Sequence, residues 1–203
     1  MMNNKPNKDW TGTPNSLFKM LGASSHTDKE RDVKDYYATN PIAAELLLQN
    51  ETFDRPVWEC ACGKKHLSRV LERHGLTVRS SDIVDRCGNE QYDFLAMDNT
   101  RWDGHIVTNP PYRAATEFVE KALRIIPPGN KVCMFLRLQF LEGRRRKYLF
   151  QSNPPRTVYV FSSRVECAKN GDFKAVGGGS AVAYAWFVWV KGYRGDTVVK
   201  WIN

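Results

Sequence analysis

The sequence has little that would place it in a membrane or in a disulfide-bonded, secreted class. None of its apolar runs approaches the roughly 20 residues of a membrane-spanning helix. Its polar start, MMNNKPNKDW, lacks the apolar core of a signal peptide. Its five cysteines are an odd number at irregular spacing, which does not fit a disulfide framework. These absences predict a soluble protein of the cytoplasm.

The chain is also poor in groupings that would bind a metal. Cys60, Cys62 and His66 lie close together in the sequence, but three ligands in a strand-to-helix turn, with no second cluster, make a poor zinc signature. A small buried thiol is a more ordinary role for a cysteine. We therefore predict no metal and interpret Cys60 and Cys62 as buried thiols.

Acidic residues are scarce in one segment, and this scarcity explains the net charge of +8. Residues 121–156 contain nine Lys or Arg and one acid, Glu142, whereas the remaining chain contains 21 basic and 21 acidic residues. The run RRRK alone would not exceed an ordinary solvated helix face. Concentration of the whole excess in one segment instead predicts a polyanionic partner, most simply nucleic acid. No membrane partner is indicated, and the oligomeric state stays undetermined.

The 203 residues suit one substantial hydrophobic core. We interpret residues 1–35 as a polar N-terminal arm and residues 36–203 as a single domain. Asn40 and Pro41 form a typical helix start before ELLL. The later segments alternate between strand and helix patterns, and this order predicts an α/β fold with a doubly wound, mostly parallel sheet that ends in an antiparallel hairpin. The strand-like segments are PVWECAC, LTVRSSD, GHIVTN, KVCMFLRL, RTVYVF and VAYAWFVWVKG; the later helix-like segments are HLSRVLERHG, AATEFVEKALRIIPPG and EGRRRKYLF.

Acidic residues stand at or just beyond the predicted strand ends, where a doubly wound sheet binds its ligand. Glu59 precedes a turn with Gly63, a residue that allows close approach of backbone to a ligand. Asp82 ends the next strand and can accept bonds from both hydroxyls of a ribose. Asp93 could accept from an adenine amino group while Phe94 packs against the ring. A strand-end acid is often only a helix cap, but together these residues predict a pocket for an adenosine-containing cofactor.

The stretch NPPY follows an apolar strand and precedes a helix. The prolines hold the turn rigid, so that the Asn109 side-chain oxygen and the Pro110 carbonyl can face one point. Two acceptors suit a planar amino group and help its nitrogen to pyramidalise towards an electrophile. Pro111 completes the turn, and Tyr112 offers a face on which a base can stack. The alternative is a proline-rich turn with a surface tyrosine.

Together these motifs resemble those of class I S-adenosylmethionine-dependent amino methyltransferases, specifically adenine-specific DNA methyltransferases of phage and bacterial type. The resemblance covers about residues 35–192, and NPPY is its most specific part. DYYATNP resembles the family's first motif, which implies that Tyr37 and Thr39 lie along the methionine end of the cofactor. The resemblance also implies Glu59 and Gly63 near the amino-acid moiety, Asp82 at the ribose and Asp93 at the adenine.

The sequence departs from the family pattern in two respects. Lys65 stands where the family usually has a second glycine; it could crowd the cofactor or point outward from the helix start. The chain also has little room for a separate target-recognition domain, so its own basic residues must contact the nucleic acid. The candidates are Arg113, Arg144, Arg145, Arg146, Lys147, Lys169 and Lys174.

The leading hypothesis is methylation of the 6-amino group of adenine in double-stranded DNA, in a bacterial or phage-infected host cytoplasm, with the target base flipped onto Tyr112. Other enzymatic hypotheses are methylation of an RNA base amine, of a cytosine amine, or of a protein glutamine amide. A catalytically weak DNA-binding relative is the alternative from another class, and Lys65 is the residue that favours it.

Overall fold

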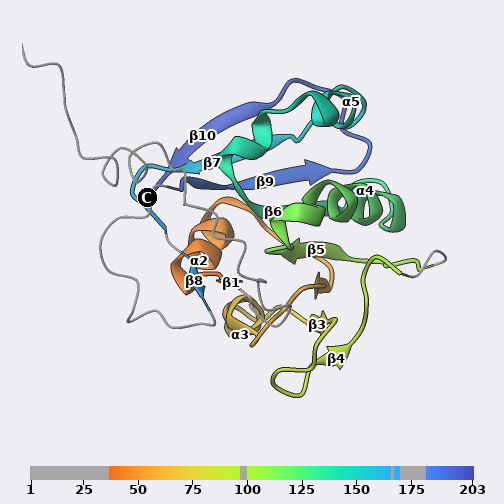
Figure 1. The fold of residues 1–203 in the computed structure, drawn as a ribbon, viewed down its shortest axis with the longest axis vertical. Coiled ribbons are helices and arrows are strands. Elements are labelled where there is room, and N and C mark those ends of the chain that lie inside the picture. Colours follow the sequence, from red (N-terminus) through yellow and green to blue (C-terminus); the bar gives the residue numbers. More distant parts are fainter. Residues whose placement is uncertain (1–36, 97–99, 166, 170–181) are drawn as a thin grey trace, which may run out of the picture. The chain divides into compact units, whose positions relative to one another are not determined.

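The computed structural model describes residues 37–96, 100–165, 167–169 and 182–203 (Figure 1). The arm predicted for residues 1–35 and the candidate Lys174 lie outside the described residues. Within the described part of the chain, no helix is long and apolar enough to cross a membrane.

One large sheet runs through the domain, and the candidate site lies at the carboxyl ends of its parallel strands. Its strand order is β10-β7-β9-β6-β5-β2-β3-β4, and all neighbouring pairs are parallel except those that β9 makes with β6 and β7. This arrangement confirms the α/β fold with a mostly parallel, doubly wound sheet. The strands are β2 (Val57–Glu59), β3 (Val78–Asp82), β4 (Glu90–Gln91), β5 (His105–Thr108), β6 (Lys131–Arg137), β7 (Thr157–Phe161), β9 (Tyr184–Val190) and β10 (Val198–Ile202).

The predicted antiparallel pairing of the last strands is confirmed between β7 and β9, and the sheet also contains a further strand at this end. Strand β9 inserts between β6 and β7 and runs antiparallel to both, with Tyr184 opposite Arg137 and Val188 opposite Thr157. Strand β10, which the sequence did not predict, then adds in parallel to β7 at the edge. Only its last residue, Ile202, is buried, so β10 lacks the apolar pattern by which an inner strand is found.

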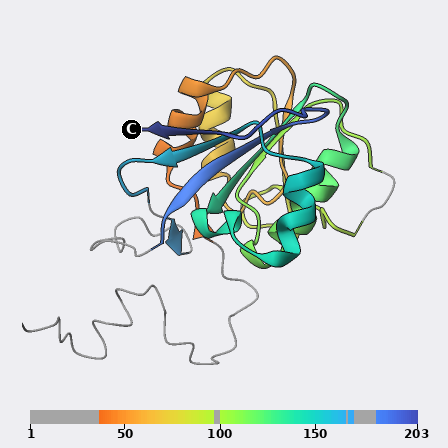
Figure 2. The same cartoon turned by 90° about the horizontal axis from the view of Figure 1, so that it is seen from above.

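Helices cover both faces of the sheet, with α2 (Pro41–Asn50) and α3 (His66–Arg73) on one side and α4 (Ala115–Ile125) and α5 (Lys147–Ser152) on the other (Figure 2). Each face has its own apolar cluster: Leu47 and Leu71 belong to the first, and Val119 and Leu149 to the second. The predicted start of α2 is confirmed, because Pro41 is its first residue and the Asn40 side chain accepts from the Ile42 N–H at 3.1 Å.

Several short elements lie near the carboxyl ends of the parallel strands. Strand β1 (Tyr37–Ala38) pairs antiparallel with β8 (Ala168–Lys169). The 3-10 helix η1 (Tyr112–Ala114) leads from β5 into α4, and η2 (Leu138–Leu141) follows β6. The predicted basic helix is divided into the 3-10 helix η3 (Arg144–Arg146) and α5.

Candidate functional site

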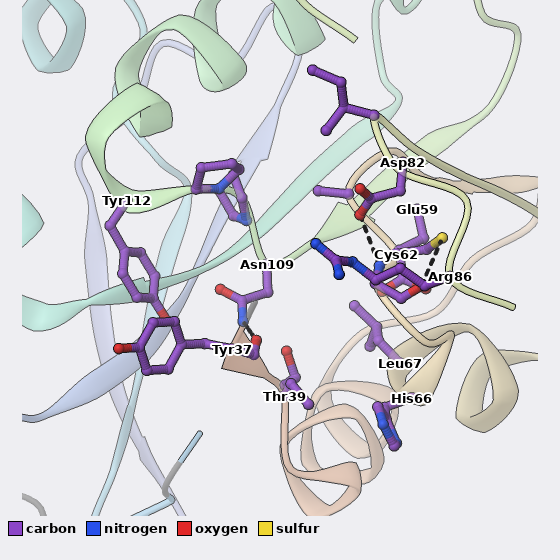
Figure 3. A pocket seen from close by; sticks show the side chains of 16 residues that line it. Tyr37, Thr39, Glu59, Cys62, His66, Leu67, Asp82, Arg86, Asn109 and Tyr112 are labelled. Carbon is purple, nitrogen blue, oxygen red and sulfur yellow. Dashed lines mark hydrogen bonds between the residues drawn. The ribbon is translucent and has the colours of Figure 1, made fainter. Parts of the chain in front are cut away.

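A cavity of about 180 Å³ lies where the strand order changes direction. From β2 the chain moves outward to β3 and β4, then returns to place β5 on the other side of β2. Doubly wound sheets bind ligands at this point, beyond the carboxyl ends of the strands. The structure brings most of the predicted cofactor and catalytic residues together on the cavity wall: Tyr37, Thr39, Glu59, Gly63, Asp82, Asn109, Pro110, Pro111 and Tyr112 (Figure 3).

Asp82 ties the glycine turn to the end of β3. Its Oδ2 accepts from the Gly63 N–H at 2.9 Å, and its Oδ1 accepts from the Val84 N–H at 3.1 Å. Gly63 has a φ of 53°, in the left-handed region that glycine adopts without strain. The carboxylate therefore aligns two loops of the cavity and keeps further lone pairs with which to accept from a ligand.

Lys65 lies outside the cavity. Its ammonium donates to the Gly88 carbonyl at 3.2 Å, and the residue is absent from the described cavity wall. Its φ of 62° is left-handed, which costs a non-glycine residue about 1–2 kcal/mol. This backbone conformation is a physical reason for a glycine at this position, and the lysine side chain extends towards Gly88 and away from the cavity.

Glu59 is a buried carboxyl group on the cavity wall. Its Oε2 accepts from the Ser68 N–H at 2.8 Å and also from the Ser68 hydroxyl. Burial raises the pKa of Glu59 to about 8, even though the bonds from Ser68 oppose the shift. At neutral pH the carboxyl group is therefore mostly protonated, and a cation beside it would favour release of the proton.

Asn109 presents an acceptor at the end of β5. Its Nδ2 donates to the Tyr37 carbonyl at 2.9 Å, which fixes the plane of the amide (Figure 3). Its Oδ1 is buried and has no hydrogen-bond partner within the described part of the chain. A buried acceptor without a donor is costly, so a water molecule or a ligand is expected to supply one. The Asn109 oxygen is thus an unused acceptor on the cavity wall, and its contact with a substrate amine stays a prediction.

Tyr112 is half-buried, and its ring is held by neighbours from three elements. The ring centroid lies 5.9 Å from that of Tyr184, the hydroxyl lies 3.6 Å from Cys167 Sγ, and Arg137 Cζ lies 4.9 Å from the ring centroid. Burial raises the pKa of Tyr112 well above its usual range, so the phenol stays protonated. The ring is therefore a preorganised apolar surface beside Asn109.

Two predicted cofactor residues do not line the cavity. Phe94 is 2% exposed and packs in the core, with ring centroids 5.3 Å from Trp58 and 4.9 Å from Phe118. Asp93 accepts from the Leu95 N–H at 2.9 Å through its Oδ1, as a local turn does. The structure thus gives Phe94 a packing role, and the contact of Asp93 with an adenine stays a prediction.

Two cavity residues from the segment after β3 were not predicted from the sequence. Ile83 is exposed, and Arg86 extends from this segment into the cavity (Figure 3). An apolar residue directly after a strand-end acid was the available signal for Ile83. The remaining cavity residues are Ala38, Ala61, Cys62, His66 and Leu67.

The predicted nucleic-acid residues divide into two kinds. Arg144 and Arg145 are exposed, as are Arg113 and Lys147. Arg146 instead holds its own loop: its Nε donates to the Phe140 carbonyl at 2.8 Å, and its Nη2 donates to the Glu142 carbonyl. The Lys169 backbone belongs to β8, opposite Tyr37.

The two cysteines beside the glycine turn are buried, as predicted, at 2% exposure for Cys60 and 5% for Cys62. Burial raises the pKa of both thiols well above the usual range. Within the described residues, no three His, Cys, Asp or Glu side chains are grouped as metal ligands would be.

Comparison with known proteins shows the fold. No family model matches the sequence, and no curated protein matches it by sequence. A Listeria monocytogenes protein described as a class I S-adenosylmethionine-dependent methyltransferase is similar in structure, with a TM-score of 0.56, 13% identity, and coverage of 84% of this chain and 67% of that one. An Agrobacterium tumefaciens protein described as an O-methyltransferase has a TM-score of 0.55 and 13% identity, with coverage of 80% of this chain and 85% of that one. The 23S rRNA methyltransferase ErmE has a TM-score of 0.50 and 18% identity, with coverage of 79% of this chain and 70% of that one. The chain therefore has the Rossmann-like fold of class I methyltransferases.

Proposed function

We propose that this protein transfers a methyl group from S-adenosylmethionine to the 6-amino group of adenine in double-stranded DNA. The observation that carries the proposal is the buried Asn109 Oδ1, which lies on the cavity wall and has no donor within the described residues. An exocyclic amine has the two N–H donors that such an acceptor and a neighbouring proline carbonyl would use.

The donor set of the cavity fits S-adenosylmethionine. Asp82 is suited to ribose hydroxyls, and Glu59 is suited to a cationic group because its proton leaves readily when positive charge approaches. The class I methyltransferase fold of the structural relatives supports the same cofactor. When bound, this cofactor supplies an electrophilic methyl group on a positively charged sulfur.

The chain's own residues would prepare the amine for attack. Asn109 Oδ1 and the Pro110 carbonyl each accept one N–H, and this contact opposes delocalisation of the nitrogen lone pair into the ring. The lone pair then points towards the electrophile, and the two fixed dipoles stabilise positive charge that develops on the nitrogen. Tyr112 holds the plane of the base by stacking, which is worth about 1–3 kcal/mol. No histidine base is needed before the methyl group is transferred, and the methylated nitrogen then releases its extra proton to water.

Duplex DNA is supported by the basic surface and by the resemblance of NPPY to adenine-specific DNA methyltransferases. Arg144, Arg145 and Lys147 are exposed in the segment that follows β6, the strand beside β5. Such cations neutralise phosphates without reading sequence. A base in a duplex must leave the stack to reach the cavity, and Tyr112 offers it a surface.

An RNA base amine is the second candidate, because ErmE, an rRNA methyltransferase, is among the structural relatives. The same acceptors would suit it, since an exposed amine on RNA has the same donors. The position of Lys65 outside the cavity argues against the catalytically weak relative.

The experiment is incubation with methyl-labelled S-adenosylmethionine and, separately, duplex DNA, RNA and protein, followed by identification of the modified unit. The proposal expects label in DNA as N6-methyladenine. Label in RNA alone, in cytosine or in glutamine would replace the DNA proposal with that substrate. Asn109→Ala is the matched control, because it removes the acceptor and leaves the basic surface intact.

A further inference from the structure

Arg137 is a half-buried cation that has no anionic partner among the described residues. It is the last residue of β6, the strand beside β5, and β5 leads into NPPY (Figure 1). Its Nε is buried and has no hydrogen-bond partner within the described part of the chain. None of the ion pairs among these residues includes Arg137. A charge held partly out of water without a counter-charge is costly, so an anion from elsewhere is expected.

Two other partly buried arginines of this protein are paired with carboxylates. Arg79 Nη2 lies 2.7 Å from Glu90 Oε1. Arg156 forms an ion pair with the buried Glu51. In both cases the chain itself supplies the negative charge that a guanidinium needs when it leaves water. Arg137 departs from this pattern, which favours an anion from outside the chain.

The side chains around the Arg137 guanidinium are neutral. Its Cζ lies 4.9 Å from the centroid of the Tyr112 ring. Tyr184 is its register partner on β9, and burial raises the pKa of the Tyr184 phenol to about 12. Burial also raises the pKa of the Cys167 thiol, which lies 3.6 Å from the Tyr112 hydroxyl, to about 11. This cluster of described side chains therefore carries no negative charge at neutral pH, and the charge of Arg137 is left for a ligand.

The place of Arg137 separates it from the cofactor. Tyr112 lines the cavity, whereas Arg137 is not among the residues of the cavity wall. The chain continues from Arg137 through η2 to the exposed Arg144 and Arg145. The guanidinium thus contacts the ring proposed to hold the base and directly precedes the basic segment in the chain. An anion bound here belongs with the substrate and not with the cofactor.

We propose that Arg137 binds a phosphate group of the nucleotide whose base stacks on Tyr112. The inference rests on the proposed function. A base and its phosphates are covalently linked, so a base on Tyr112 brings a phosphate near the guanidinium that contacts the same ring. The planar guanidinium presents parallel N–H donors to two phosphate oxygens, a geometry that a lysine does not reproduce. Arg137 thereby holds the nucleotide after its base leaves the stack, without reading the base.

The test compares two labelled single-stranded oligonucleotides, each with one adenine among thymines. One has ordinary phosphodiesters, and the other has uncharged methylphosphonates on both sides of the adenine. Single strands are used because their bases need no extraction from a duplex. Fluorescence anisotropy gives both dissociation constants for the wild type, Arg137→Met, Arg137→Lys and Arg69→Met. Arg69 is the matched control, because it is an exposed cation on α3 outside the cavity wall.

We expect the wild type to bind the phosphodiester oligonucleotide about tenfold more tightly than the methylphosphonate one, as fits one charge-assisted contact. This preference should largely disappear in Arg137→Met, decrease in Arg137→Lys and persist in Arg69→Met. Circular dichroism and thermal unfolding establish that each variant is folded. Calorimetry with S-adenosylhomocysteine should give the wild-type affinity in every variant, because Arg137 lies outside the cavity wall.

The outcomes separate this inference from the function on which it rests. A wild type without the preference that still methylates DNA would overturn the inference alone. The same preference in Arg137→Met as in the wild type, or an equal loss in Arg69→Met, would also overturn it. Weaker binding of S-adenosylhomocysteine by Arg137→Met would assign the guanidinium to the cofactor and contradict the phosphate contact. A wild type that methylates no DNA would overturn the proposed function as well.

Discussion

Two buried glutamates in this protein have opposite pKa shifts. Glu51 follows α2 and lies beside the amino-terminal ends of β6 and β7, with its carboxylate bonded to Lys131 at 2.7 Å, to Tyr159 at 2.8 Å and to Arg156. Burial alone would raise the Glu51 pKa, but these bonds together lower it below the usual value. Glu59, at the opposite edge, has Ser68 as its partner, and burial raises its pKa to about 8.

The difference between the two carboxyl groups indicates that Glu51 stabilises the fold, whereas Glu59 belongs to the candidate site. Glu51 has cations from this chain, so it is charged and satisfied as the protein folds. Glu59 faces a cavity, and the hydrogen bonds that it accepts come from Ser68, which is neutral. Perturbed carboxyl groups in cavities mark candidate functional sites, while paired ones stabilise the fold. Changes at the Glu51 cluster should therefore cost stability, and changes at the cavity should alter binding or chemistry.

The largest expected effect is at Glu51. Glu51→Ala removes the buried carboxylate that Lys131 and Arg156 share. This loss should lower the free energy of unfolding by about 3–5 kcal/mol. Urea unfolding measures this loss. Glu45→Ala is the control, because Glu45 pairs with Arg73 and His74 at a more exposed position, where about 1 kcal/mol or less is expected. Equal losses in the two variants would show that the Glu51 cluster has no special role.

The contribution of Glu59 to stability should become less favourable as the pH rises, because its pKa is raised by folding whereas that of Glu51 is lowered. A carboxyl whose folded-state pKa is raised favours folding while it is protonated, so its penalty grows as the pH rises from about 4.5 towards 8. Glu59→Gln should match the wild type near pH 5 and exceed it near pH 8 by on the order of 3 kcal/mol. Thermal or urea unfolding across this range is the measurement. Parallel wild-type and variant curves would contradict the assignment.

Arg144 and Arg145 should contribute to binding of nucleic acid, whereas Arg146 should not. Replacing Arg144 and Arg145 together with Gln should reduce the slope of log affinity against log salt by about 1.8, since each lost phosphate contact on duplex DNA contributes about 0.9. Arg146→Gln should leave the slope unchanged and destabilise the loop that it holds. Fluorescence anisotropy with a labelled duplex gives both slopes. An unchanged slope in the double variant would make the pair a solvated face.

The smallest expected effect is at Lys65. Lys65→Gly relieves a left-handed backbone conformation at the cost of more freedom in the unfolded chain, so stability should rise by about 0.5–1 kcal/mol. Affinity for S-adenosylmethionine should not change, because the lysine lies outside the cavity. A gain in cofactor affinity would show instead that the lysine side chain obstructs the ligand.

The parts of the fold that could be predicted from the sequence depend on local signals. Asn40 and Pro41 marked the start of α2, because a cap and a proline at the first helical turn act on neighbouring residues only. Glu59, Asp82 and Asn109 could be assigned to one site because parallel strands bring their carboxyl ends to the same edge.

The remaining features depend on contacts between distant residues. The pairing of Tyr37 with Lys169 joins two-residue strands far apart in the sequence, and neither has a pattern long enough to predict it. Phe94 follows an acid near the expected site, but whether its ring faces a ligand or the core depends on Trp58 and Phe118. The direction of Arg86 likewise depends on the tertiary contacts of its loop.

The central claim is that the Asn109 oxygen accepts the substrate amine during methyl transfer. Its most direct test is single-turnover methylation by Asn109→Ala, with cofactor affinity measured on the same preparation. We predict a chemical step slower by about 100-fold or more, as expected for the loss of one preorganised contact, with cofactor affinity close to that of the wild type. An Asn109→Ala protein that binds the cofactor normally and methylates at the wild-type rate would contradict the claim.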